Sequence, residues 1–323
     1  MKSTMNNISQ IIDEMDGPIL ITGASGFIGS NLARKIAKTR DDVHIIVRNG
    51  SNLRRIEDML PQITVHRADL SDRNDIFLKI GEIQPKTIFH AAAYGVHSFQ
   101  NETEKIETAN LHGTINLLDA CVKSGFKIFI NTGSSSEYGT KNKPMKETDL
   151  LTPNSDYAVF KAAATLYCQH LARSKKIPII TLRPFSVYGQ FEESTKLIPT
   201  LIRSFLDGTC PPLVSPDTAR DYIFIDDLVD AYLIASQKPE LGGEIFNVGS
   251  GKQTTLKEIV DLSIRLTGAA VEPEWGTMSP RIWDHNMWQA DISKIKSILD
   301  WSPKTDLKEG LARTIDWIES DGN

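Results

Sequence analysis

A glycine-rich turn stands near the start of the chain, between a short apolar run and an amphipathic segment. The run Ile19-Leu20-Ile21 leads into Gly23-Ala24-Ser25-Gly26-Phe27-Ile28-Gly29, and a helical pattern over 27–38 follows. In such a turn the first glycine permits the bend, the second lets backbone approach a pyrophosphate, and the third packs helix on sheet. The N-terminus of the following helix favours negative charge. The sequence therefore predicts a strand–turn–helix unit that binds a dinucleotide.

The first two thirds of the chain alternate strand-like and helix-like segments. The strand candidates are short, apolar and rich in isoleucine and valine, and they cover 18–22, 43–47, 63–66, 87–90, 127–131 and 178–182. Helical stretches lie between them, over 27–38, 53–60, 72–80, 104–123 and 156–172. This repetition predicts a parallel sheet covered on both faces, an α/β doubly wound Rossmann fold. Ligands on such a sheet bind beyond the carboxyl ends of the strands.

From about residue 186 prolines and short elements dominate, and all tryptophans lie between Trp275 and Trp317. Residues 221–225 and 244–248 are predicted strands that return to the core, with a helix over 226–236 between them. The predicted domains are a Rossmann domain over 18–185 and 221–263, a smaller discontinuous C-terminal substrate lobe over 186–220 and 264–323, and an N-terminal extension over 1–17. Apolar residues at helical spacing make that extension either a short amphipathic helix or a flexible start.

Composition excludes several classes of function. The net charge is −5 with acids and bases interspersed, which argues against a nucleic-acid surface. No apolar run approaches the ~20 residues of a membrane span, and acidic residues at 13, 14 and 16 interrupt any signal-peptide core. The three cysteines and seven histidines show no metal-ligand spacing, so no metal site is predicted. We expect a cytoplasmic protein whose partner is a small molecule, not nucleic acid or membrane.

A second motif, Tyr157-Ala158-Val159-Phe160-Lys161, lies far downstream and is preceded by Ser134. Tyr157 and Lys161 project from one helix face. Tyrosine ordinarily has a pKa of about 10, and a nearby ammonium and a nicotinamide cation favour its ionised form. Tyr157 is then suited to exchange a proton with a carbonyl oxygen, Lys161 to hold the nicotinamide ribose, and Ser134 to hydrogen-bond the reacting oxygen. A tyrosine and a lysine at this spacing also arise by chance, but Ser134 and the glycine turn favour hydride-transfer catalysis.

The residues after the second, third and fourth predicted strands indicate the type of cofactor. NAD sites usually carry an acid after the second strand, whereas this chain has Arg48. Arg48 is suited to bind the 2′-phosphate of NADP, with help from Ser51, Asn52 or Arg54. The alternative is that Arg48 is a solvated arginine at a strand end that binds no ligand. Asp69 and Leu70 are expected at the adenine, and the small side chains of Ala91, Ala92 and Ala93 allow a flat ring to approach. NADP(H) is therefore favoured over NAD(H).

These motifs resemble the extended short-chain dehydrogenase/reductase family, which comprises nucleotide-sugar epimerases, dehydratases and reductases. The likeness covers nearly the whole chain after residue 17. The similar segments are Gly23–Gly29, Asp69-Leu70, His90–Ala93, Ser134–Gly139, Tyr157–Lys161, Leu182–Gly189, Ala219–Ile223 and Asn247–Gly249. Ser25, Phe27, Ile28 and Pro184 within these segments are also expected at the cofactor.

The resemblance implies a nucleoside-diphosphate sugar as substrate, held by the smaller lobe. Arg220, in the family's Arg-Asp-Tyr/Phe motif, is expected to pair with the diphosphate, because arginine offers a bidentate fork that matches phosphate geometry. Lys196 and Arg281 are matched only by approximate similarity, and the alternative is an exposed surface charge. Further predicted substrate contacts are Ser135, Ser136 and Ser186.

Two departures from the family pattern narrow the expected reaction. The 4,6-dehydratases place an Asp-Glu pair where this chain has Ser135 and Ser136, which disfavours dehydration. The string Gly133–Gly139 is similar to GDP-4-keto-6-deoxymannose reductases, and many epimerases have asparagine in place of Ser186. We therefore expect an NADPH-dependent 4-reductase of an NDP-4-keto-6-deoxyhexose in deoxysugar biosynthesis, with hydride transferred to C4 and Tyr157 as proton donor.

Two alternatives stay open. The first is an NDP-sugar 4-epimerase with tightly bound NAD. The second is a non-catalytic dinucleotide sensor, against which the intact Ser134, Tyr157 and Lys161 argue. In the family, helices that match 104–123 and 156–172 form a two-fold four-helix bundle, so a homodimer is expected.

Overall fold

The computed structural model describes residues 7–96, 99–279 and 287–321, which fall into two compact units. The first unit comprises 1–139, 150–183 and 229–246, and the second comprises 140–149, 184–228 and 247–323. The second unit thus includes most of 221–263, which the sequence pattern assigned to the nucleotide-binding part. Each unit is built from segments that are discontinuous in sequence.

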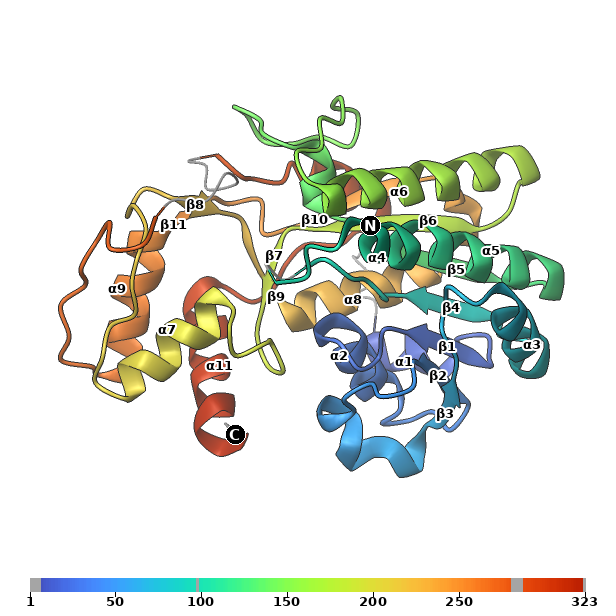
Figure 1. The fold of residues 1–323 in the computed structure, drawn as a ribbon, viewed down its shortest axis with the longest axis horizontal. Helices are drawn as coiled ribbons and strands as arrows, with labels where there is room; N and C mark the ends of the chain where they lie inside the picture. The colour runs from blue at the N-terminus through green and yellow to red at the C-terminus, as the bar shows by residue number, and fades with distance from the viewer. Residues whose placement is uncertain (1–6, 97–98, 280–286, 322–323) are drawn as a thin grey trace. The chain divides into compact units, whose positions relative to one another are not determined.

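A seven-stranded sheet confirms the predicted α/β class. Its strands are β1 (Ile19–Thr22), β2 (Val43–Val47), β3 (Thr64–Arg67), β4 (Thr87–His90), β5 (Ile128–Thr132), β6 (Ile179–Pro184) and β10 (Ile245–Val248). The order β10-β6-β5-β4-β1-β2-β3, with parallel pairing from β3 through to β6, is that of a doubly wound Rossmann fold (Figure 1). The chain runs outward from β1 to β3 and restarts at β4. The topological switch point therefore lies between β1 and β4, where such folds bind their ligand.

One predicted strand does not join this sheet, so its expected return to the core is wrong. β9 (Tyr222–Phe224) pairs in parallel with β7 (Ser186–Tyr188) in a separate two-stranded sheet. Only Phe185 separates β7 from the end of β6, and the Ser186 N–H donates to the Asp221 carbonyl at 2.9 Å. The chain that leaves the main sheet therefore pairs with β9 directly. A second small sheet joins β8 (Ala219–Arg220) to β11 (Thr254–Thr255).

The predicted helical segments are present close to their predicted bounds, apart from one interruption, and further helices lie where the sequence pattern predicted none. They are α1 (Ile8–Asp13), α2 (Phe27–Ile36), η1 (Arg54–Gln62), α3 (Arg73–Ile83), α4 (Thr103–Glu107), η2 (Thr108–His112), α5 (Gly113–Ser124), η3 (Ser135–Tyr138), α6 (Asp156–Lys175), α7 (Leu197–Leu206), α8 (Ile225–Ser236), η4 (Pro239–Leu241), α9 (Leu256–Thr267), α10 (Ser293–Leu299) and α11 (Leu307–Asp321). The single helix predicted over 104–123 is divided by η2, a π-helical turn. No helix within the described residues is both long and apolar enough to cross a bilayer.

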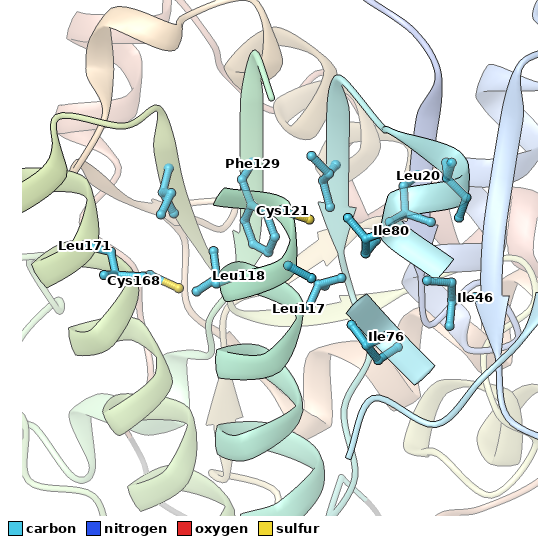
Figure 2. Close-up of a cluster of buried hydrophobic side chains, with 14 of the residues drawn as sticks. Leu20, Ile46, Ile76, Ile80, Leu117, Leu118, Cys121, Phe129, Cys168 and Leu171 are labelled. Atoms are coloured by element: carbon cyan, nitrogen blue, oxygen red, sulfur yellow. The ribbon is translucent and has the colours of Figure 1, made fainter. Parts of the chain in front are cut away.

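A hydrophobic cluster joins α3, α5 and α6 to one face of the sheet. Figure 2 shows strand residues such as Leu20, Ile46 and Phe129 together with side chains of the three helices, which are Ile76, Ile80, Leu117, Leu118, Cys121, Cys168 and Leu171. On the opposite face Phe89 packs edge-on against Tyr232 of α8, with ring centroids 6.3 Å apart. Because helices cover both faces of the sheet, its strands consist of nearly continuous apolar residues rather than alternating apolar and polar ones. This packing fixes the strand ends from which the site is built.

Candidate active site

The glycine turn between β1 and α2 has the shape of a phosphate cradle. Gly23 has a φ of +73°, and a Cβ there would lie 2.5 Å from the Ala92 backbone nitrogen. A Cβ on Gly29 would overlap the Gly23 carbonyl, so this glycine lets α2 pack against the turn. Among the described residues no side chain caps the first turn of α2, and that turn contains no acidic residue. Its backbone N–H groups and the positive end of its dipole therefore fit a pyrophosphate.

The other predicted residues of this turn are accessible from solvent in part. Ser25, Gly26, Phe27 and Ile28 are all half-buried. The Gly26 N–H donates to the Gly23 carbonyl at 2.9 Å, which closes the bend. The turn therefore keeps its shape through its own backbone.

A cavity of about 460 Å³ lies beyond the ends of β2 and β3. Its lining residues are Arg48, Asn49, Gly50, Ser51, Ala68, Asp69, Asp72 and Asp75. The structure thus brings the predicted Arg48, Ser51 and Asp69 into one cavity, and Leu70 follows directly. Three aspartates against one arginine make the lining acidic, which disfavours an additional phosphate group there.

The loop after β4 is held by a buried asparagine of the π-helical turn η2. Asn110 donates from Nδ2 to the Tyr94 carbonyl at 2.6 Å and to the Ile106 carbonyl at 2.8 Å. Its Oδ1 accepts the Tyr94 N–H at 3.3 Å. This clamp fixes the loop that contains Ala91, Ala92 and Ala93, the first two of which lie against Gly23. The loop backbone at Ala91 and Ala92 therefore lies close against the glycine turn after β1.

His90, the last residue of β4, forms a buried chain of hydrogen bonds. Its Nδ1 lies 2.7 Å from the Thr22 hydroxyl and its Nε2 lies 2.9 Å from the Thr114 hydroxyl. The Thr114 hydroxyl donates to the Asn110 carbonyl at 2.6 Å, so it accepts from Nε2, and Nδ1 accepts from Thr22. Burial, with a smaller effect of the Lys161 charge, lowers the pKa of His90 to about 3. The imidazole is therefore neutral and ties β1, β4 and α5 together.

Ser134, Tyr157 and Lys161 gather at the carboxyl end of β5. Ser134 is the N-cap of η3, whereas Tyr157 and Lys161 project from the first turns of α6. The Tyr157 hydroxyl hydrogen-bonds the Ser134 side chain. Lys161 is 2 % exposed, and its Nζ donates to the Thr132 carbonyl at 2.5 Å. The structure therefore assembles the three predicted side chains from two elements that are adjacent in space.

Burial controls the protonation of this group. Burial raises the pKa of Tyr157 to about 12; the hydrogen bond from Ser134 lowers it and the charge of Glu137 raises it further. Burial lowers the pKa of Lys161, and the charge of Glu137 opposes that change. The sequence predicts that the ammonium and a nicotinamide cation together favour the ionised form; burial acts in the opposite direction and is the first cause of the shift in the pKa of Tyr157. Tyr157 is held as the neutral phenol, the form that donates a proton to a carbonyl oxygen.

The predicted substrate residues belong to both units. In the first unit Ser135 is buried and Ser136 half-buried, and Ser136 Oγ lies 2.7 Å from Ser134 Oγ. In the second unit Ser186 lies in β7 and Lys196 is the N-cap residue of α7. Pro184 ends β6, and Arg281 lies outside the described residues.

Arg220, also in the second unit, is placed by its neighbours. Its guanidinium carbon lies 5.2 Å from the centroid of the Trp288 ring, a cation–π geometry. The adjacent Asp221 is buried and accepts hydrogen bonds from the Ser250 N–H, the Ser250 hydroxyl, the Gly251 N–H and the Ala290 N–H, at 2.6 to 3.0 Å. Asp221 thus fixes the backbone from which Arg220 projects.

Three residues that the sequence pattern did not select contact the predicted ones. Asn110 clamps the loop after β4, Glu137 accepts the Ser134 N–H at 2.7 Å, and Arg55 donates to the Ser25 carbonyl at 3.3 Å. A polar residue within an otherwise apolar helical face was the available signal for Asn110. Glu137 and Arg55 act through tertiary contacts, for which a single sequence carries no periodic signal.

Comparison with known proteins gives consistent matches over this fold. Residues 19–249 match the model of the "NAD dependent epimerase/dehydratase family". A UDP-glucose 4-epimerase of Mycolicibacterium smegmatis is 30% identical over 315 residues, which cover 93% of this chain and 98% of that protein.

Two solved structures are similar at 26% identity. An epimerase of Methanothermobacter thermautotrophicus superposes with a TM-score of 0.89 and covers 99% of this chain and 97% of its own. A UDP-glucose 4-epimerase of Thermotoga maritima, solved with UDP-glucose, gives a TM-score of 0.85 and covers 94% of this chain and 99% of its own.

Proposed function

Because the chain belongs to the NAD-dependent epimerase/dehydratase family and is an enzyme acting on nucleotide sugars, we propose that its reaction is the 4-epimerisation of a nucleoside-diphosphate hexose. The observation that carries this proposal is the Ser134, Tyr157 and Lys161 group at the end of β5, without the acids that a dehydratase requires. The sequence pattern favoured a 4-reductase. The relatives named as UDP-glucose 4-epimerases support the alternative instead.

Dehydration is disfavoured on chemical grounds. Elimination of water needs an acid and a base beside the sugar, in addition to the hydride-transfer group. The two positions after Ser134 hold hydroxyls, which do not ionise near neutral pH. Ser136 Oγ is also within hydrogen-bond distance of Ser134 Oγ, so it supports the catalytic hydroxyl.

The roles of the residues follow from their geometry. A bound nicotinamide would supply the hydride acceptor for oxidation at C4 of the sugar and the hydride donor for its reduction on the opposite face. The positive charge of bound NAD would favour the ionised Tyr157, which then takes the C4 hydroxyl proton as hydride leaves and, as the phenol, returns it to the C4 oxygen when hydride is restored. Ser134 hydrogen-bonds both that oxygen and the phenol. Lys161 holds the nicotinamide ribose and supplies positive charge behind Tyr157. The glycine turn and the N-terminus of α2 hold the pyrophosphate.

NAD is the cofactor that fits this reaction and this site. The cavity beyond β2 and β3 contains three aspartates and one arginine, so it suits a ribose hydroxyl better than a 2′-phosphate. The family model is itself described as NAD-dependent. An epimerase returns the hydride that it takes, so it needs no net supply of reduced cofactor.

The test is interconversion without added reductant. The purified protein is incubated with UDP-glucose, UDP-galactose or UDP-glucuronate and NAD, and the products are separated by anion-exchange chromatography. Formation of the C4 epimer supports the proposal, and Tyr157→Phe protein is the matched control. No epimer from any of these sugars, alongside NADPH oxidation with a 4-keto-6-deoxy nucleotide sugar, contradicts it.

That second outcome identifies the other candidate, an NADPH-dependent 4-reductase. Arg48 favours it, because no acid stands at the end of β2 and the Arg48 side chain is exposed at the cavity. Binding of NAD and NADP is compared for wild type and Arg48→Ala. A preference for NADP that disappears in Arg48→Ala favours the reductase.

A further inference from the structure

Glu137 is a fully buried carboxylate beside the catalytic group, and both of its oxygens are occupied. Oε1 accepts the Ser134 N–H at 2.7 Å and the Thr165 hydroxyl at 3.0 Å. Oε2 accepts hydrogen bonds from Nε and Nη2 of Arg183, each at 2.8 Å. The Arg183 side chain is 2 % exposed, and its Nη1 donates to the Tyr138 hydroxyl at 2.9 Å. One carboxylate therefore joins η3, α6 and β6.

Its partner on α6 continues the catalytic face of that helix. Tyr157, Lys161 and Thr165 are spaced four residues apart, so they lie in one row. Glu137 binds the third member of this row and, through the same oxygen, the backbone of Ser134. One atom, Glu137 Oε1, therefore links Ser134 to the helix that contains Tyr157 and Lys161.

The surroundings are shaped to admit this carboxylate. A Cβ on Gly133 would lie 2.7 Å from Glu137 Oε1 and 3.0 Å from both Arg183 Cγ and Thr181 Cγ2. Ser134 and Glu137 also form a capping box, in which the Ser134 side chain caps η3 while Glu137 accepts the Ser134 N–H. The missing side chain at Gly133 makes room for the Glu137 carboxylate, and the capping box fixes where that carboxylate lies.

We propose that Glu137 is a positioning residue, which holds Ser134 in register with Tyr157 and Lys161 and, through its ion pair with Arg183, places a negative charge behind them. This inference deepens the proposed function, on which its kinetic test rests. Arg183 holds the carboxylate through two hydrogen bonds, so neither Ser134 nor α6 moves without breaking a buried ion pair. Misplacement of the reacting groups by ~1 Å is enough to reduce turnover about a hundredfold.

The charged and titratable groups that face Tyr157 define the electrostatic test. They are Glu137 from η3 and Tyr232 from α8. Lys161 in turn faces Glu137, Cys168 and His90. Since the charge of Glu137 raises the pKa of Tyr157, its removal moves the titration of Tyr157 to lower pH.

Two variants separate position from charge. Thr165→Val removes only the hydroxyl that ties α6 to Glu137, and Thr165→Ser restores it as a matched control. Glu137→Gln keeps the shape and removes the charge. For each variant, the turnover number kcat and the Michaelis constant of the epimerisation reaction are measured across pH. The phenolate absorbance of the NAD-loaded protein is titrated against Tyr157→Phe, and thermal unfolding gives the folded fraction.

We expect Thr165→Val to lower kcat about ten- to a hundredfold with little change in the Michaelis constant, and Thr165→Ser to restore it. Glu137→Gln lowers kcat and shifts the Tyr157 titration to lower pH. An unchanged kcat per folded molecule in Thr165→Val, or an unmoved titration in Glu137→Gln, overturns the proposal. If the wild-type protein epimerises no sugar, the proposed function fails, while the phenolate titration still tests Glu137 by itself.

Discussion

Desolvation decides the charge of the residues around the catalytic group. His90 and Lys161 both have lowered pKa values, and Tyr157 has a raised one, with burial as the first cause in each. A buried group that exchanges protons therefore depends on hydrogen bonds to neighbours rather than on water. For Tyr157 that neighbour is Ser134, whose hydrogen bond lowers the pKa of the phenol and so favours its ionised form.

Tyr157→Phe tests the proton exchange at the residue scale. We expect kcat to fall by about 10²–10⁴-fold, because the proton of the C4 oxygen then has no partner. The Michaelis constant for the nucleotide sugar changes much less, since the ring remains. Initial rates over a range of sugar concentrations give both quantities. Tyr167→Phe, on the same helix, is the control, and an equal loss in both variants contradicts the assignment.

His90 makes stability depend on pH. Its folded pKa of about 3 lies below the ordinary value of 6.5, so the unfolded chain binds the extra proton as pH falls. The free energy of unfolding therefore decreases from about pH 6.5 toward pH 3, by about 1.4 kcal/mol per pH unit from this residue. Urea unfolding at about pH 7 and about pH 5 measures the slope. His44 and His66, whose pKa values are also lowered, add to it. A His90→Gln protein with the wild-type slope would show that His90 is not the source.

The grouping of the proposed catalytic residues was predictable from the sequence because they occupy short motifs with fixed spacing. Ser134, Tyr157 and Lys161 lie together as expected. The pKa of Tyr157 was not predictable, because burial depends on packing by residues distant in sequence. The role of Glu137 was not predictable for the same reason, since its four hydrogen bonds join η3, α6 and β6, which are distant in sequence.

At the scale of elements, apolar periodicity located the strands within one or two residues. Periodicity did not predict which sheet a strand joins, because β9 pairs with β7 and not with the seven-stranded sheet. It also missed the π-helical turn η2, which keeps helical apolar spacing on both sides. That turn places Asn110 against Tyr94, and π-helical turns are frequent at functional sites.

Arg40 hydrogen-bonds the end of the N-terminal helix α1, whose Ile11 and Ile12 are also buried. Nη1 of Arg40 donates to the carbonyls of Ile12, Asp13 and Met15, at 2.8 to 3.2 Å, and the guanidinium pairs with Asp42. These carbonyls lie at the end of α1 and in the turn that follows it, where few intrahelical N–H partners remain. We expect Arg40→Ala to lower the free energy of unfolding by about 1.5–3 kcal/mol and to expose 7–16 to proteolysis. The exposed Lys38→Ala is the control in chemical unfolding and limited trypsin digestion. Equal stability of the two variants refutes this role.

At the scale of the molecule, α6 displays an apolar stripe on its outer face. Val159 is 43% exposed and Leu166 is 53% exposed, and the two are one heptad apart on the helix. A second copy of the chain would cover them, as the expected homodimer requires. We predict a dimer by sedimentation at micromolar concentration, and a monomer for the double variant Val159→Asp and Leu166→Asp. Leu150→Asp, a substitution at a more exposed position outside any helix, should leave the dimer intact. A monomeric wild-type protein rules the dimer out.

The discontinuity of the two units limits how this protein can be dissected. A fragment that ends at residue 183 keeps the cofactor turn and the catalytic helix, but it lacks β10 and α8. Strand β6 would then present an unpaired edge, and Phe89 would lose the ring of Tyr232. Open strand edges promote intermolecular association. Such a truncation should therefore aggregate during expression, and the dinucleotide half is obtained only by circular permutation or by keeping the chain entire.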